Sequence, residues 1–492
     1  MTWRQYHEST KHSAESLRRA RYGLDWANMP DPFRNYEGVP VLDLPADPPV
    51  PEIPALDVLQ GGSGGTAAAD GPAFLSQLLF YSAAISASKR VPSTGYRYAL
   101  RVNPSSGNLH PTEFHFITRG LKDWPDGLYH YRAASHMAEQ RALGNFSAKV
   151  LDPDAPIVFI LTSIAWREAW KYRDRAYRYC LHDMGHAWQA LAIAARAMGC
   201  DSFAAGHFAD DEVAQFCRLN DDEWPMLVVG LRGLPIPMRA PDAGETVWFG
   251  GRANRLSNEY VPYPQIDSIH AVTKLQECGA IRECEPAAAE SGETKLPPPA
   301  SSARTFGEVA RTRRSALDFQ GGTLSMSLAQ LSAILDAAAR PFFADFSGTR
   351  FVQLYLYVHR VEGLAPGVYR HWAESADLEM IRPGDQRVAA AGLSLGQDLA
   401  GNACVTFSMI ADIDRAARTH GDRGYRYVHF EAGAIGQDLY LAAEALGLQA
   451  TGIGAFFDDQ VHNYLNLPAA GDKQVVYHFA IGHAVPDPRI EA

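Results

Sequence analysis

The sequence has few cysteines and no long apolar run. Six cysteines occur among 492 residues, and no two of them form a CxxC pair. This argues against a disulfide-stabilised secreted domain and against a cysteine zinc site. No apolar stretch reaches the ~18 residues needed to cross a bilayer, and the polar N-terminus lacks the apolar segment of a signal peptide. We therefore expect a cytoplasmic protein with reduced thiols and no membrane segment.

Positive charge is also scarce. The chain carries 45 Lys and Arg residues against 56 Asp and Glu residues, a formal net charge of −11. It therefore has no basic surface that would attract nucleic acid or an anionic membrane, and we expect neither as a partner. With 47% hydrophobic and 21% charged residues, the chain is globular and long enough to form at least two domain cores.

What the sequence does contain is an internal duplication. Residues 167–219 align without a gap with residues 415–467, at a constant offset of 248 that places Lys171 opposite Thr419. Both copies keep the motif DRxYRY. Further upstream, GLYHY at 127–131 matches GVYRH at 367–371, at an offset of 240. The chain is therefore a fusion of two related units, and two such units can build one site between them.

Hydrophobic periodicity predicts a similar series of elements in each half. In the first half we expect helices over 74–88 and 177–198, and strands over 113–118, 156–163 and 225–230. In the second half we expect helices over 327–339 and 427–446, and strands over 351–359, 404–411 and 475–481. This mixture predicts an α+β fold, with a central sheet flanked by helices in each unit.

Changes in composition divide the chain into four segments. Residues 1–50 form an N-terminal arm without a match in the second half, and residues 51–250 form the first unit. Residues 251–303 form a linker, whose part rich in Pro and Ala we expect to be mobile, and residues 304–492 form the second unit. A glycine-rich run at 61–65 has no following Lys, so we interpret it as a flexible connection rather than a phosphate-binding loop.

The two copies differ in two short motifs. The first copy carries Pro104, Ser105, Ser106, Gly107 and Asn108 before a strand, and such small residues let backbone amides approach a flat polar ring. At the 240 offset the second copy has residues 344–348 instead, ADFSG, and the motif is lost.

The reverse holds for a basic motif. Arg313, Arg314 and Ser315 stand before a helical segment of the second copy and suit the binding of a phosphate. The first copy has no cation at the equivalent distance before its helix. Each half has kept what the other has lost, which predicts one site per chain, made from both halves.

These motifs resemble those of the nitroreductase-like flavoproteins, and within them the SagB/ThcOx-type dehydrogenases, over roughly residues 70–235 and 304–485. Members of that family bind FMN at a dimer interface. The resemblance implies two tandem nitroreductase-like domains with mostly antiparallel sheets, which form a pseudo-dimer within one chain.

The resemblance also implies roles for individual residues. Arg313, Arg314 and Ser315 would hold the FMN phosphate and ribityl chain, and Pro104 to Asn108 would line the isoalloxazine ring. Gly452, Ile453, Gly454 and Ala455 would lie over the flavin near N5 and offer backbone amides. Arg489 is the one late basic residue that would complete the phosphate site.

Lys171 and Tyr172 are the candidate catalytic residues. They resemble a Lys-Tyr pair that handles the substrate proton in azoline-oxidising members of the family. The second copy has Thr419 and His420 instead, which fits a single active site. The alternative, in which Lys171 is solvated and Tyr172 packs beneath the next helix, stays open.

Other polar residues favour structural roles. His182 and His186 imitate an HExxH zinc helix, but Asp183 is shorter than the usual Glu and no third ligand is evident, so we expect no metal. His110 is expected to cap or pack. We expect four arginines of the DRxYRY motifs to pair with Asp174 and Asp422 at the pseudo-twofold interface; they are Arg175, Arg178, Arg423 and Arg426.

Three functions follow from this interpretation. The first is FMN-dependent dehydrogenation of a small molecule or peptide, by hydride transfer at flavin N5. The second is NAD(P)H-driven reduction of nitroaromatics or quinones. The third is a non-catalytic flavin-binding scaffold. The sequence does not choose between the electron acceptors or donors.

Overall fold

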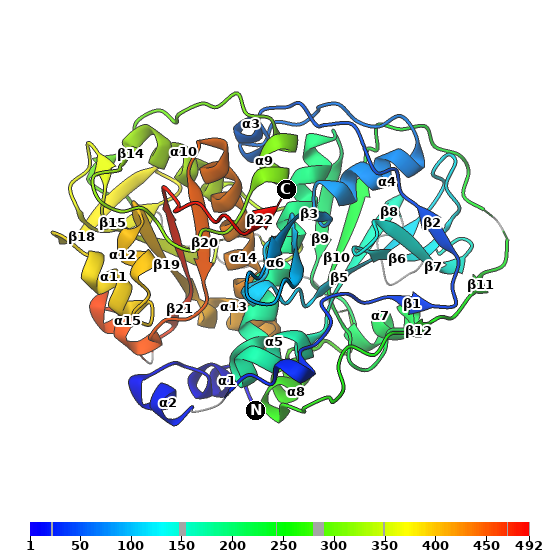
Figure 1. The fold of residues 1–492 in the computed structure, drawn as a ribbon, viewed down its shortest axis with the longest axis horizontal. Coiled ribbons are helices and arrows are strands. Elements are labelled where there is room, and N and C mark those ends of the chain that lie inside the picture. The colour runs from blue at the N-terminus through cyan, green and yellow to red at the C-terminus, as the bar shows by residue number, and fades with distance from the viewer. Residues whose placement is uncertain are drawn as a thin grey trace.

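The chain folds into two similar units on either side of a central pair of long helices (Figure 1). The structure is a computed structural model, and it describes residues 1–20, 23–146, 154–242, 244–278, 290–347, 350–469 and 471–491. Within these ranges, no helix has both the length and the apolar character required to traverse a bilayer.

The first unit contains a sheet in the order β11-β7-β6-β5-β8-β10-β9, with β2 paired to β7. Its strands are β2 (Val41–Asp43), β5 (Thr112–Thr118), β6 (Gly127–Arg132), β7 (Met137–Leu143), β8 (Ile157–Ser163), β9 (Asp201–Ala205), β10 (Trp224–Arg232) and β11 (Val247–Trp248). All of its ladders are antiparallel.

The second unit repeats this sheet in the order β13-β18-β17-β15-β19-β21-β20. Its strands are β13 (Thr294–Lys295), β15 (Val352–Val358), β17 (Gly367–Trp372), β18 (Asp377–Pro383), β19 (Val405–Asp412), β20 (Gln449–Ile453) and β21 (Lys473–Gly482). Apart from the short edge strands, the two orders are the same. The predicted α+β fold, with two tandem domains built on antiparallel sheets, is confirmed.

The two units meet through the long helices α6 (Ala176–Ala197) and α14 (Gly424–Ala445). These helices cross where Gly185 faces Gly433, two positions that are equivalent in the duplication. A Cβ atom on Gly185 would lie 2.2 Å from the carbonyl oxygen of Phe430, and one on Gly433 would lie 2.1 Å from that of His182. Only glycine permits this approach, so the crossing fixes how the units pack.

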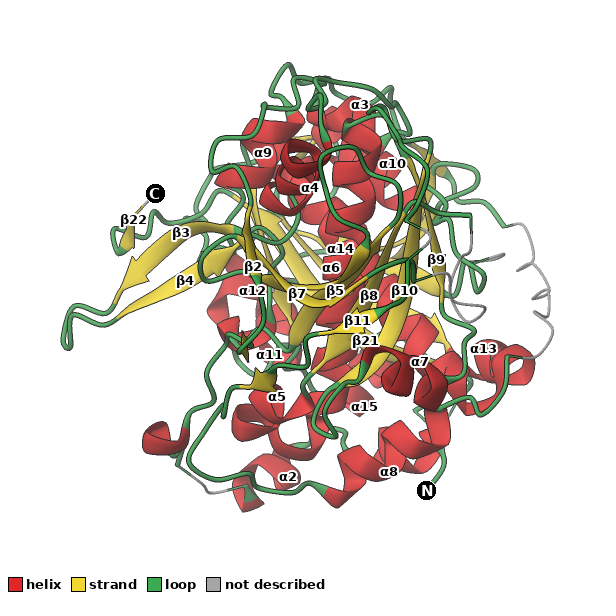
Figure 2. Ribbon diagram, turned by 90° about the vertical axis from the view of Figure 1, so that its right-hand side faces the viewer, coloured by secondary structure: helices red, strands yellow, loops and turns green. Residues whose placement is uncertain are grey.

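Further helices pack on the faces of the sheets and against the central helix pair (Figure 2). They are α3 (Ala55–Leu59), α4 (Gly71–Phe80), α5 (Ala165–Tyr172), α7 (Asp210–Cys217), α9 (Phe306–Thr312), α10 (Leu328–Ala339), α11 (Arg387–Leu393), α12 (Asp398–Asn402), α13 (Ile413–His420) and α15 (Asp458–Tyr464). Two minor ladders join β1 (Tyr36–Glu37) to β12 (Arg252–Ala253) and β14 (Met326–Ser327) to β16 (Val361–Glu362).

The helix predicted over 74–88 is wrong beyond Phe80. From Ile85 the chain forms strand β3 (Ile85–Arg90), which pairs with β4 (Arg97–Arg101) and with β22 (Ile490–Glu491) near the C-terminus. Figure 2 shows this small sheet projecting from the body of the molecule. Local periodicity missed it because one of its partner strands comes from the far end of the chain.

The segment predicted as a linker is structured where the structure describes it. Helix α8 (Pro264–Thr273) and strand β13 both lie in it, whereas residues 279–289 are outside the described ranges. The glycine-rich run is also held, because Gly64 N donates to the carbonyl of Arg196 at 3.2 Å. A Cβ atom on Gly65 would lie 2.6 Å from the carbonyl oxygen of Ala197.

The helix α8 is the counterpart of α1 (Trp3–Ser9) in the N-terminal arm. Both carry the sequence HxxTK, as His7 to Lys11 and as His270 to Lys274. The threonine hydroxyls, Thr10 Oγ1 and Thr273 Oγ1, accept hydrogen bonds from Arg178 at 3.1 Å and Arg426 at 2.9 Å. The arm continues with α2 (Ala14–Arg19). The duplication therefore includes a helix at the start of each unit, which sequence comparison missed.

Candidate active site

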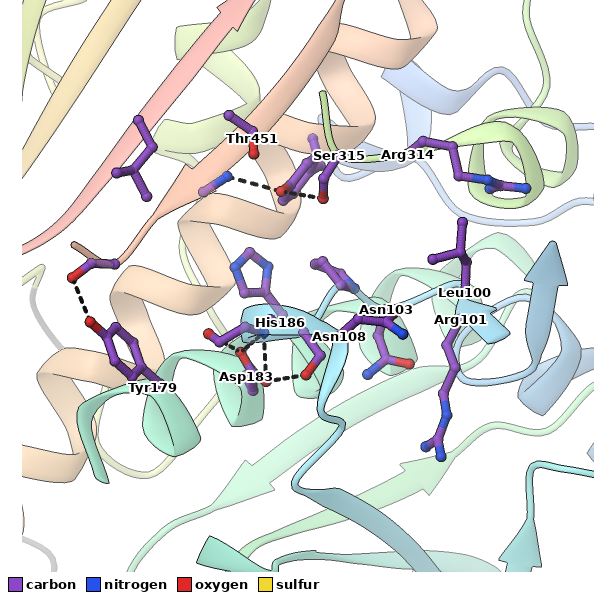
Figure 3. Close-up of a pocket in the computed structure, with 18 of the residues that line it drawn as sticks. Leu100, Arg101, Asn103, Asn108, Tyr179, Asp183, His186, Arg314, Ser315 and Thr451 are labelled. Atoms are coloured by element: carbon purple, nitrogen blue, oxygen red, sulfur yellow. Dashed lines mark hydrogen bonds between the residues drawn. The ribbon is translucent and has the colours of Figure 1, made fainter. Parts of the chain in front are cut away.

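A cavity of about 400 Å³ lies between the two units, where the motifs kept by different copies meet (Figure 3). Cavities of this size typically enclose small molecules or cofactors. The first unit contributes β4, the loop at 104–108 and α6, and the second contributes the segment after α9, α14, β20 and β21. The wall contains Pro104, Ser105, Ser106, Gly107, Asn108, Tyr172, Arg313, Arg314, Ser315, Gly452, Ile453, Gly454 and Ala455.

The loop at 104–108 is anchored to α6 by Asp183. The buried carboxylate accepts hydrogen bonds from Ser105 Oγ at 2.6 Å, from Ser106 Oγ at 2.9 Å and from Ser106 N at 3.0 Å. Burial raises the pKa of Asp183 to about 7, although these hydrogen bonds favour its charged form. The loop is thus held rigidly at the cavity wall, with Asp183 beneath it.

The predicted catalytic pair lies against Gly107 of this loop. Gly107 has a φ of +59°, and a Cβ atom there would lie 2.9 Å from Lys171 Nζ and 2.7 Å from Tyr172 Oη. Both residues end helix α5, and the ring of Tyr172 lies 4.4 Å from that of Tyr179 between centroids. Burial lowers the pKa of Lys171, opposed by the charge of Glu168. Lys171 is thus half-buried next to the loop rather than fully solvated.

The basic motif supplies positive charge at the other side of the cavity. Arg313 is 3% exposed and donates to the carbonyl oxygens of Val102 at 3.1 Å and Arg101 at 3.2 Å. Its Nη1 has no hydrogen-bond partner among the described residues. Arg314 donates to backbone carbonyls, including that of Ser86 at 3.0 Å. Burial lowers the pKa of Arg314 to about 10, which leaves it charged at neutral pH.

The segment Gly452–Ala455 forms a further part of the cavity wall, and no side chain fits at Gly452 or Gly454. A Cβ atom on Gly452 would lie 2.0 Å from Tyr477 Oη, and one on Gly454 would lie 2.1 Å from Tyr179 Cε1. Tyr179 Oη donates to the carbonyl of Gly454 at 3.0 Å. These contacts fix a glycine-rich backbone at the cavity surface.

Tyr440 ties this segment to the basic motif. Its hydroxyl accepts from Gly452 N at 2.9 Å and lies 2.8 Å from Ser315 Oγ. The two motifs that the second copy contributes to the cavity are therefore joined through one side chain of α14.

The pseudo-symmetric position in the other half of the interface is filled by protein. There, Asp345 accepts hydrogen bonds from Gly206 N at 2.8 Å and His207 N at 3.0 Å. The ring of Phe346 stacks on Tyr427 at 4.3 Å and 9°. Gly206 and Tyr427 are the counterparts of Gly454 and Tyr179, so the segment that replaced the 104–108 motif occupies the space equivalent to the cavity.

Two buried arginine–aspartate clusters join the units. Arg175 and Arg178 contact Asp458 at 3.0 and 2.9 Å, and Arg423 and Arg426 contact Asp210 at 2.6 and 2.7 Å. Asp458 and Asp210 are equivalent in the duplication. Each cluster therefore pairs arginines of one unit with the first helical residue of α15 or α7 in the other, where the helix dipole also favours a carboxylate.

The predicted partners of these arginines, Asp174 and Asp422, are wrong. The backbone carbonyl of Asp174 accepts from Tyr6 Oη, and Asp422 Oδ1 accepts from Trp3 N at 2.9 Å. The long arginine side chains cross the interface instead of folding back to their neighbours in sequence. Both aspartates are used to hold the N-terminal helix α1.

The late arginine does not reach the cavity. Arg489 Nε lies 2.7 Å from Asp487, and Arg489 is not part of the cavity wall, to which Lys89 and Ile490 contribute instead. The prediction that Arg489 completes a phosphate site therefore has no support. Sequence alone could not decide this, because β22 is positioned by its pairing with β3.

The two histidines of α6 contact the side chain of Tyr477. His186 Nε2 lies 3.1 Å from Tyr477 Oη, and the ring of His182 stacks on that of Tyr477 at 4.3 Å. His110 is buried on the cavity wall. No group of three or more potential metal ligands was found in the described ranges.

Several wall residues were missed by sequence reasoning. Tyr440 and Tyr477 face the cavity, whereas the first copy has Ala192 and Leu227 at the equivalent positions. Asp183 was considered only as a poor substitute for a zinc-site glutamate. A search for buried positions where one copy is polar and the other apolar would have found both tyrosines.

Comparison with known proteins supports the duplication. Residues 84–233 and 310–483 each match the Nitroreductase family. A putative nitroreductase from Methanocaldococcus jannaschii is 32% identical over 167 residues, which cover 32% of this chain and 83% of that protein. The trifolitoxin-processing protein TfxB from Rhizobium leguminosarum bv. trifolii is 27% identical over 140 residues, 26% of this chain and 37% of that protein.

A solved structure shares the whole architecture. The crystal structure of a putative nitroreductase from Anabaena variabilis aligns with a TM-score of 0.77 at 25% identity, over 99% of this chain and 100% of that one. The family match covers more than half of the chain and falls once in each unit. The chain therefore belongs to the nitroreductase family, as two tandem nitroreductase-like domains.

Proposed function

We propose that this chain is an FMN-dependent oxidoreductase of the SagB-type dehydrogenase class, with one FMN site built from both units. The observation that carries the proposal is the cavity itself. It joins the 104–108 loop of the first copy to the 313–315 motif of the second, and the equivalent space across the interface is filled by Phe346.

The cavity residues fit FMN. Arg313 and Arg314 are partly or fully buried and form no ion pair with a carboxylate in the described parts of the chain. Because buried cations are costly unless paired, an anion such as the FMN phosphate would satisfy Arg313 Nη1 and Ser315 Oγ. With no side chain at Gly452 or Gly454, a flat polar ring can approach the backbone of Gly452–Ala455 closely.

The expected reaction needs both a hydride carrier and a group that handles a proton. FMN, when bound, supplies a hydride acceptor or donor at N5. Oxidation of a C–N or C–C single bond also releases a proton, and Lys171 and Tyr172 are the acid–base groups that lie next to Gly107. Because burial lowers the pKa of Lys171, a larger share of its amine is neutral and able to accept a proton than in an exposed lysine.

The relatives suggest two classes of substrate. The likeness to a trifolitoxin-processing protein favours oxidation of a peptide, such as azoline to azole. The likeness to a nitroreductase favours the second candidate, NAD(P)H-driven reduction of nitroaromatics or quinones. The lysine and tyrosine, which only one copy keeps, favour the peptide or small-molecule dehydrogenase.

Variants of Lys171 and Tyr172 test the proposal, and the duplication supplies matched controls. Lys171→Ala and Tyr172→Phe are compared with Thr419→Ala and His420→Phe, each loaded with FMN. The assays are O2-dependent oxidation of an azoline peptide and NADPH-dependent quinone reduction. General acid–base catalysis contributes about 10²–10⁴-fold, so peptide oxidation should fall by that amount in the first pair only. Equal rates in all four variants would favour the scaffold, and loss of quinone reduction alone would favour the reductase.

A further inference from the structure

Gln397 places a side-chain amide on the cavity wall, outside the motifs of the cofactor site. It follows the turn between α11 and α12 of the second unit and is half-buried. Its side chain belongs to the wall of the cavity between the two units. This amide is therefore available to a molecule that binds in the cavity.

The orientation of the amide follows from its partners. Gln397 Nε2 donates to the carbonyl oxygen of Ser394 at 2.7 Å and to that of Ala455 at 3.2 Å. Both partners are acceptors, so the nitrogen of the amide faces them, and both of its N–H groups are used. No described residue donates to Gln397 Oε1, and this oxygen does not cap α12. Gln397 thus offers the cavity an acceptor and no donor.

The turn that carries Gln397 is fixed to the core of the second unit. Ser394 is 0% exposed, and its hydroxyl lies 3.1 Å from His478 Nδ1 on β21. Leu395 has a φ of +57°, a left-handed conformation that costs free energy in any residue other than glycine. Such a conformation persists only where the surrounding structure imposes it. The turn therefore holds Gln397 in one place on the wall.

The connection that contains Gln397 is longer than its counterpart in the first unit. Eight more residues separate β18 from β19 than separate β7 from β8, and the offset between the copies changes from 240 to 248 across this connection. The longer connection belongs to the unit whose segment Gly452–Ala455 lies on the cavity wall. Gln397 contacts the last residue of that segment.

A series of contacts along the wall joins Gln397 to the candidate catalytic pair. Gln397 contacts Ala455, and the carbonyl of the preceding residue, Gly454, accepts from Tyr179 Oη at 3.0 Å. The ring of Tyr179 lies 4.4 Å from that of Tyr172. The same wall therefore presents the acid–base pair, the glycine-rich segment and the acceptor of Gln397.

We propose that Gln397 is a specificity-determining residue, and that its Oε1 accepts a hydrogen bond from an N–H group of the substrate. A molecule that cannot donate would leave this oxygen without a partner, which weakens its binding. The backbone amides of a peptide carry N–H groups, whereas simple quinones and nitroaromatics do not. The inference rests on the proposed function, within which it favours a peptide substrate.

Binding of a matched pair of peptides tests this assignment without turnover. The first probe is a short peptide that contains one thiazole, the oxidised ring, with a free amide N–H on each side of it. The second probe carries methyl groups on these two nitrogens. Isothermal titration measures the dissociation constant of each peptide with the full chain loaded with FMN. The proteins are the natural chain, Gln397→Ala, and Gln397→Met, which nearly keeps the side-chain volume but has no amide.

Gln386→Ala is the matched control. Gln386 Nε2 also donates to two backbone carbonyls, those of Pro383 at 3.1 Å and Gly384 at 2.9 Å. Gln386 precedes α11 and is not part of the cavity wall. Its replacement removes a similar set of hydrogen bonds from the same connection without removing an acceptor from the cavity.

In the natural chain and in Gln386→Ala, we expect the N–H peptide to bind about tenfold more tightly than the methylated peptide, the effect of one hydrogen bond. The ratio should fall to about one in Gln397→Ala and Gln397→Met. If Gln397 only holds Ala455 in place, its variants lose affinity for both peptides equally and the tenfold ratio stays. That result, or a ratio near one in the natural chain, would overturn the proposal.

The result is separable from the test of the proposed function. If the azoline peptide is not oxidised but the ratio depends on Gln397, the dehydrogenase proposal fails and recognition of an N–H donor stands. If the peptide is oxidised and the ratio does not depend on Gln397, only the role of Gln397 is rejected. Failure of both peptides to bind the natural chain would overturn both proposals.

Discussion

Replacing the aspartate of each arginine–aspartate cluster in turn should show which cluster affects only the stability of the interface and which also affects FMN binding. Asp458 and Asp210 occupy equivalent positions, and each is 0% exposed between two arginines. Loss of one partner of a buried ion pair costs about 3–5 kcal/mol, because charges are left uncompensated. Asp458→Asn and Asp210→Asn should therefore lower the free energy of unfolding by similar amounts.

Their effects on the cofactor should differ. Arg175, which Asp458 holds, also lies 3.4 Å from the carbonyl oxygen of Gly454 on the cavity wall. The counterpart Arg423 donates to the carbonyl of Gly206 at 2.7 Å, where the protein fills the space. Asp458→Asn should weaken FMN binding at least about tenfold, which is about 1.4 kcal/mol, and Asp210→Asn should leave it unchanged.

Two assays measure the effects of these variants on stability and on FMN binding separately. Urea unfolding followed by tryptophan fluorescence measures stability, and quenching of flavin fluorescence measures FMN binding. Burial alone would raise the pKa of Asp458, but Arg175 and Arg178 lower it overall. Its contribution to stability is thus present above the unfolded pKa of about 4 and is lost as the pH falls through the lower folded pKa. Equal FMN affinity in both variants would refute the link between this cluster and the cavity.

Three further predictions concern the cavity wall. Gly452→Ala places a Cβ atom 2.0 Å from Tyr477 Oη and should weaken FMN binding measured by fluorescence titration, whereas the first copy tolerates Ala204 at that position. Arg313→Ala should weaken FMN binding by about 1.5–3 kcal/mol, the contribution of a charged hydrogen bond, and an unchanged affinity would contradict its role. Because the pKa of Asp183 rises from 3.8 to about 7 on burial, its contribution to stability is greatest below about pH 4 and falls by about 4 kcal/mol up to pH 7. Asp183→Asn, which does not ionise, should therefore show a flatter stability curve over that range in urea titrations.

Comparison of the two copies predicted more than local patterns did. The duplication and the two tandem domains are visible in the sequence because the copies align without a gap around α6 and α14. The sequence also indicated where the site would be, since each copy lacks one motif, and the structure brings 104–108 and 313–315 to one cavity.

The features that could not be predicted from the sequence depend on contacts between segments that are far apart in the chain. The arginines of DRxYRY reach Asp458 and Asp210 rather than their neighbours, and β22 pairs with a strand about 400 residues away in the chain. In the sequence, Phe346 is an ordinary apolar residue, and only the structure shows that it stacks on Tyr427. The HxxTK helices were missed because their offset differs from that of the main repeat.

The most direct measurement of the central claim is the number of FMN molecules bound per chain. The protein is saturated with FMN, freed of excess, and the flavin released by denaturation is identified and counted against protein concentration. One FMN per chain is expected, because the cavity combines motifs from both units and Phe346 fills its counterpart. Two FMN per chain, or none after reconstitution, would contradict a single composite site.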